Sequence, residues 1–196
     1  MSSVQDIIFI LDQSGSMMRM GNEPYESLNK FIKDQSKDKD GATFTLYTFS
    51  TYVNKIIDET PLQDVEEIPS LIPAGMTSLY DAIGRAISDK IEKEKKNDVI
   101  CVILTDGLEN SSIIYNKERI KEMIDIMETD YGWEFLYLGA NQDAFHEGDM
   151  VGISSCMNYD FTPESMRQAV NTASVGIAYK RIASRNGEEN IRTKLC

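Results

Sequence analysis

Five oxygen-bearing side chains stand where buried elements of the chain are expected to begin or end. They are Asp12, Ser14, Ser16, Thr77 and Asp106. The first three alternate directly after the apolar run 7–11, the last follows the strand-like run 98–104, and the threonine precedes a helix-like segment. Two carboxylates held close together need a cation, or one of them must take up a proton. The set therefore predicts a site for a divalent cation.

The chemistry of the donor atoms narrows the choice of ion. Oxygen ligands suit Mg²⁺, Mn²⁺ and Ca²⁺, whereas Zn²⁺ prefers Cys and His. Ca²⁺ usually takes more carboxylates than this set offers, and Mg²⁺ readily keeps several waters. Mg²⁺ is therefore the first choice, with Mn²⁺ as its substitute and Ca²⁺ as an alternative. Gly15 permits the bend that points Asp12, Ser14 and Ser16 toward one ion.

The elements that must position these residues follow from the hydrophobic pattern. Largely apolar runs at 6–11, 98–104 and 133–138 are typical of strands buried on both faces. Helical periodicity marks the segments 24–35, 78–91, 117–127 and 163–182. Strands that alternate with helices predict a mostly parallel sheet, in which the carboxyl ends of the strands share one edge. The adjacent runs 42–50 and 51–58 leave no room for a crossover helix, so they predict an antiparallel hairpin.

Local signals suggest how some of these elements begin and end. Ser78 and Asp81 predict a capping box, and Thr162 predicts an N-cap. The run KIEKEKK at 90–96 indicates the solvated end of a helix. Three methionines follow the alternating Asp and Ser residues, and they either fill space beneath that loop or form an apolar rim around a partner-binding surface. They are Met17, Met18 and Met20.

Composition bounds the class of protein. The chain has 196 residues and a net charge of −12, so nucleic acid and anionic membranes are not expected as partners. No apolar run approaches the roughly 20 residues that span a membrane, and the first residues lack a signal-peptide pattern. The odd count of three cysteines indicates a reducing, cytoplasmic location. We expect one domain over 1–183 and a flexible tail over 184–196.

The motifs together resemble the metal-ion-dependent adhesion site of von Willebrand factor A domains. They read DQSGS, GMTSLYDA and LTDG, in the order typical of that family, with one mild departure at Met76, where glycine is common. The likeness extends from about Gln5 to Ile182, and the stretch GANQDAFHEGDMVGI is similar to bacterial and phage members. It implies an α/β, Rossmann-like, three-layer fold with about six strands, one of them antiparallel at an edge. It also implies metal-binding roles for the five oxygen-bearing residues.

Three functions remain open at this stage. The resemblance implies a metal-dependent protein-binding module, in which an Asp or Glu of the partner completes the coordination of Mg²⁺. A Mg²⁺-dependent phosphotransfer or phosphatase-like enzyme is the alternative, but the runs 98–104 and 133–138 are not followed directly by a lysine, and phosphate-binding glycine motifs are absent. No catalytic residue is therefore assigned. A scaffold whose metal is purely structural is the third hypothesis, and the sequence leaves the oligomeric state open.

Overall fold

A six-stranded sheet forms the centre of the protein. The computed structural model describes residues 5–38, 41–91, 98–186, 188 and 193. The strands are β1 (Gln5–Asp12), β2 (Ala42–Phe49), β3 (Val53–Pro61), β4 (Val99–Thr105), β5 (Glu134–Ala140) and β6 (Ser155–Tyr159). Their order is β3-β2-β1-β4-β5-β6, and all neighbours are parallel except β2 and β3. The predicted parallel sheet with one antiparallel edge strand is confirmed.

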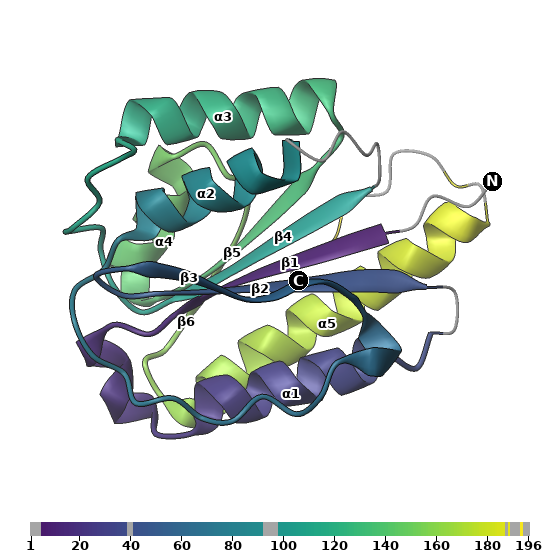
Figure 1. The fold of residues 1–196 in the computed structure, drawn as a ribbon, viewed down its shortest axis with the longest axis horizontal. Coiled ribbons are helices and arrows are strands. Elements are labelled where there is room, and N and C mark those ends of the chain that lie inside the picture. The colour runs from purple at the N-terminus through teal and green to yellow at the C-terminus, as the bar shows by residue number, and fades with distance from the viewer. Residues whose placement is uncertain (1–4, 39–40, 92–97, 187, 189–192, 194–196) are drawn as a thin grey trace.

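Helices cover both faces of the sheet, which gives three layers (Figure 1). The helices are α1 (Glu23–Gln35), α2 (Leu79–Ile91), α3 (Lys117–Asp130), α4 (Asn141–Met150) and α5 (Pro163–Arg185). Helices α1 and α5 pack on one face, and α2, α3 and α4 lie on the other. Two short 3-10 helices, η1 (Gly15–Met20) and η2 (Leu62–Asp64), follow β1 and β3. The α/β, Rossmann-like fold expected from the resemblance is therefore present.

The central strands are buried on both sides, as their continuous apolar sequences require. In β1, Ile7, Phe9 and Leu11 contribute to the core beneath α1 and α5. Ile8 and Ile10 point the other way, into the core beneath α2 and α3. Side chains alternate along a strand, so one run of apolar residues supplies two separate cores. This burial fixes the register of β1 against β2 and β4, and with it the position of the loop that follows β1.

Two sequence expectations about helix ends are wrong, and both involve long-range partners. The Asp81 carboxylate does not close a capping box with Ser78, because it accepts hydrogen bonds from the backbone N–H groups of residues 113–115. Lys90 is buried rather than solvated, since its ammonium group pairs with Asp6 of β1 at 2.7 Å and with Glu59 of β3 at 2.8 Å. Residues 92–97 of the same charged run lie outside the described residues. The N-cap at Thr162 is confirmed, because its hydroxyl accepts from the Ser165 N–H.

The structure describes only part of the segment 184–196, which was expected to be a flexible tail. Helix α5 continues through Ser184 to Arg185, so the helix is longer than its apolar stripe indicates. Thr193 is buried, and its backbone N–H donates to the Glu134 carboxylate at the start of β5. Most other residues of this segment lie outside the described part of the chain.

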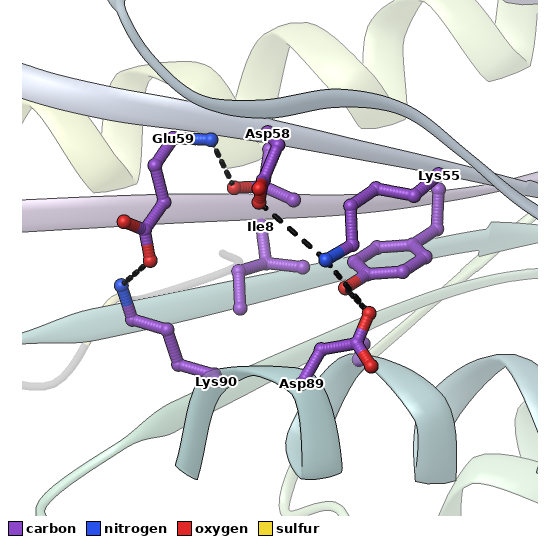
Figure 2. A pocket seen from close by; sticks show the side chains of 9 residues that line it. Ile8, Lys55, Asp58, Glu59, Asp89 and Lys90 are labelled. Atoms are coloured by element: carbon purple, nitrogen blue, oxygen red, sulfur yellow. Dashed lines mark hydrogen bonds and ion pairs between the residues drawn. The ribbon is translucent and has the colours of Figure 1, made fainter. Parts of the chain in front are cut away.

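Charged side chains fill the space between the edge strand β3 and helix α2 (Figure 2). The Lys90 ammonium group reaches from α2 to Glu59, and Lys55 of β3 lies 2.7 Å from the Asp89 carboxylate of α2. Glu59 has a φ of 43°, a left-handed conformation that is uncommon outside glycine. Its N–H donates to the Thr45 hydroxyl at 3.1 Å. Ion pairs thus connect the edge strand to the helix layer, in addition to the apolar packing of Val53 against the core beneath α2.

Candidate metal centre

The five predicted ligand residues lie together at the carboxyl edge of the sheet. We call Asp12, Ser14, Ser16, Thr77 and Asp106 the candidate metal centre. Strands β1 and β4 are parallel neighbours, so the residues that end or follow them emerge side by side, at the left of Figure 1. The Ser16 hydroxyl donates to Asp106 Oδ1 at 2.8 Å, and the Ser14 and Ser16 hydroxyl oxygens are 3.0 Å apart. Residues from two different loops therefore already share one hydrogen-bonded cluster.

Asp12 is held rigidly at the base of this cluster. Its side chain is buried, Oδ1 accepts from the Ser14 N–H at 2.7 Å, and Oδ2 accepts from the Thr105 hydroxyl at 2.6 Å. Thr105 was not singled out from the sequence. The available signal was a polar residue in the last, fully buried position of an otherwise apolar strand. This hydroxyl, at the end of β4, fixes the orientation of the Asp12 carboxylate through its hydrogen bond to Oδ2.

Thr77 approaches the cluster from a third loop. A Cβ placed on Gly107 would lie 3.4 Å from Thr77 Oγ1 and 3.9 Å from Asp12 Oδ2, so both oxygens border the same glycine. Gly15, in the first loop, donates its N–H to the carbonyl of Gly75 at 3.1 Å, close to Thr77 in the chain. The three loops are thus in direct contact. The structure brings all five residues together, while their binding of a metal stays a prediction.

The electrostatics of the cluster suit a cation. Burial raises the pKa of Asp12 above its ordinary value, although hydrogen bonds from Thr105 and Ser14 oppose the shift. Burial, and next the negative charge of Asp12, raise the pKa of Asp106 to about 6. Two carboxylates therefore face each other in a poorly solvated place, where a divalent cation would favour the charged form of both. The donor set of two carboxylates and three hydroxyls fits Mg²⁺ or Mn²⁺.

The described residues hold no group of three or more His, Cys, Asp or Glu side chains that could bind a metal. The candidate metal centre is consistent with that result, because only two of its five residues, Asp12 and Asp106, are of those four types. Of the three methionines after Ser16, Met17 and Met20 are buried under the loop, and Met18 is 60% exposed. The first two fill space in the core, and only Met18 can contribute to a rim.

The fold and the cluster together define a class of protein: three-layer α/β domains with an Asp-x-Ser-x-Ser loop after the first strand, a distant Thr, and an Asp-Gly pair after a later strand. The family model of the von Willebrand factor type A domain matches residues 6–174. The chain therefore belongs to the von Willebrand factor type A domain family, whose members commonly mediate protein–protein interactions through metal-dependent sites.

Solved structures with the same fold come from distant organisms. The pilus adhesin SpaC of Lactobacillus rhamnosus GG aligns with a TM-score of 0.74 and 13% identity, over 91% of this chain and 30% of that one. Manganese-loaded TRAP of Plasmodium vivax aligns with a TM-score of 0.64 and 17% identity, over 87% and 72%. Proximal thread matrix protein 1 of the mussel byssus aligns with a TM-score of 0.64 and 18% identity, over 88% of this chain and 46% of that one. This chain thus spans less than half of the mussel protein.

Among the described residues, no helix has the length and apolar character needed to cross a membrane.

Proposed function

We propose that this domain is a divalent-metal-dependent protein-binding module. The observation that carries the proposal is the contact of three loops around Asp12 and Asp106. Burial raises the pKa of both carboxyl groups, and the negative charge of Asp12 raises the pKa of Asp106 further. In this proposal the five residues of the candidate metal centre hold Mg²⁺, and Mn²⁺ can replace it. The bound ion would supply an electrophilic position for an Asp or Glu carboxylate of the partner.

The residues of the site supply charge and hold the carboxylates in position in this proposal. Asp12 and Asp106 supply negative charge that can at most neutralise a divalent ion, and the hydroxyls add no charge. Thr105 keeps the Asp12 carboxylate in place through its hydrogen bond to Oδ2. Because the chain carries a net charge of −12, attraction of an acidic partner must act locally, at a range shorter than the screening length of about 8 Å.

The surroundings of the candidate metal centre also suit a protein partner. Met18, Met76 and Leu108 are exposed large apolar side chains from the same three loops. Methionine adapts its shape to a contacting surface, so these residues can pack against a partner while the ion directs the contact. Among structures with this fold, SpaC is a pilus adhesin and TRAP is manganese-loaded. Both descriptions agree with a metal-dependent adhesive role, which we propose for this chain.

Partner binding should depend on the metal and on Thr77. For a partner purified from native lysate, we expect the affinity measured in Mg²⁺ to fall at least tenfold in EDTA, and comparably in Thr77→Ala, because both remove coordination of the ion. Thr129→Ala, an exposed threonine of α3, is the matched control and should bind normally. Replacing the contacting Glu or Asp of the partner by Gln or Asn should mimic EDTA. Equal affinities in all conditions would place the interaction surface elsewhere.

The enzyme hypothesis remains the alternative, and we propose that the domain lacks hydrolase and phosphotransfer activity. We expect no turnover of p-nitrophenyl phosphate in Mg²⁺ or Mn²⁺, measured against a no-protein blank. Turnover that disappears in Asp12→Asn would contradict this expectation and favour a phosphatase-like enzyme. A cytoplasmic location also stays a proposal, based on the odd count and wide spacing of the three cysteines.

A further inference from the structure

The loop between β4 and α3 forms hydrogen bonds with the backbone of Thr77 on both sides of its Cα. The Thr77 N–H donates to Asn110 Oδ1 at 2.9 Å, and the Asn110 N–H donates to the Thr77 carbonyl at 3.0 Å. Thr77 is 4% exposed, whereas Asn110 lies at the surface. Two hydrogen bonds in opposite directions fix both peptide groups of one residue. Asn110 therefore holds the backbone segment from which the Thr77 side chain projects.

A second residue of the same loop holds the start of the helix that follows Thr77. Glu109 Oε2 accepts from the Tyr80 N–H at 2.9 Å, so this carboxylate caps α2 from outside the helix. Glu109 Oε1 accepts from the N–H groups of Ser111 and Ser112, which makes the loop itself rigid. The Ser78 and Ser111 hydroxyl oxygens are 2.8 Å apart. The loop and the start of α2 thus form one connected unit.

We propose that Asn110 is a positioning residue of the candidate metal centre. Asp106 supplies one ligand, and Asn110, four residues later, holds a second ligand, Thr77, against it. Gly107 lies between them, since a Cβ there would be in van der Waals contact with Thr77 Oγ1, at 3.4 Å. The segment Asp106–Asn110 therefore both provides a ligand and orients another that is distant in sequence. This inference rests on the proposed function.

The test compares the affinity of three variants for Mn²⁺, measured from the EPR signal of the free ion. Asn110→Ala should weaken Mn²⁺ binding by roughly tenfold or more, the usual effect of losing a residue that orients a ligand. Asn110→Asp keeps the acceptor oxygen and should bind at least as tightly as the wild type, because its added negative charge favours a cation. Asn116→Ala is the matched control: its side chain also accepts a backbone N–H at 2.9 Å, from Arg119, but at the start of α3. Its affinity should stay within about twofold of the wild type.

Amide hydrogen exchange of the metal-free protein gives an independent readout. Asn110→Ala should accelerate exchange at the Thr77 amide, and Asn116→Ala should not, because only the first removes the acceptor of that N–H. If the wild type binds Mn²⁺ and Asn110→Ala binds it with the same affinity, this inference is overturned while the proposed function stands. Equal losses of affinity in Asn110→Ala and Asn110→Asp would also overturn it, since the acceptor is retained in the second. Failure of the wild type to bind Mn²⁺ or Mg²⁺ would overturn the proposed function and this inference with it.

Discussion

Mg²⁺ at one hundred times its dissociation constant should raise the free energy of unfolding by about 2.7 kcal/mol, because a ligand that binds only the folded form shifts the equilibrium by mass action. Asp12→Ala should abolish this gain, since the variant lacks the carboxylate at the base of the cluster. The measurement is the thermal or urea-induced unfolding of each protein in Mg²⁺ and in EDTA. The metal-free wild type should still fold, because its core comes from the sheet and helices.

Two further variants separate loss of the metal from loss of the fold. Asp12→Asn keeps the size of the side chain and should also show no response to Mg²⁺. Asp125→Ala removes an exposed carboxylate of α3 and should respond like the wild type. Identical unfolding of the wild-type protein in Mg²⁺ and in EDTA would count against the site.

Replacing Lys90 should have the largest effect on stability. Lys90→Met should lower the free energy of unfolding by about 3–5 kcal/mol, because removing the lysine leaves the buried carboxylate of Asp6 and the partly buried carboxylate of Glu59 without their shared cation. Methionine has a similar length, so the variant isolates the loss of charge from the loss of volume. Urea-induced unfolding followed by circular dichroism measures the change.

An exposed lysine provides the comparison for this variant. Lys33→Met on α1 should change the free energy of unfolding by no more than about 0.5 kcal/mol, as surface substitutions usually do. A loss below about 1 kcal/mol in Lys90→Met would show that water or other groups compensate the two carboxylates. The charged layer between β3 and α2 would then be dispensable for stability.

The elements that could be predicted from the sequence are those whose burial requires apolar residues in a regular pattern. Strands β1, β4 and β5 are apolar because they are covered on both faces, and their predicted bounds are close to the observed ones. Strand β6 was not predicted from its own residues, because Ser155–Tyr159 is a short edge strand that is mostly half-exposed. Its mixed composition resembles a loop as much as a strand. Only the resemblance to a known family indicated a sheet of about six strands.

The candidate site shows the same division between local and long-range information. The placement of Asp12 and Asp106 at one edge follows from parallel pairing of apolar strands, so it could be predicted. Thr105 and Asn110 act through contacts between segments far apart in the chain, and neither has a distinctive local pattern. The predicted capping role of Asp81 is wrong for this reason: its carboxylate oxygens accept hydrogen bonds from the backbone of residues 113–115 and not from its own helix.

The irregular geometry of β3 disfavours pairing of this edge strand with a strand of a second molecule. A regular outer strand offers a row of unpaired N–H and C=O groups to which a second chain can add a strand. In β3 the pairing with β2 is interrupted by register shifts, Glu59 is left-handed, and Pro61 has no N–H to donate. The opposite edge, β6, is only five residues long. Both borders of the sheet are therefore poor templates for strand-by-strand aggregation, even in concentrated solution.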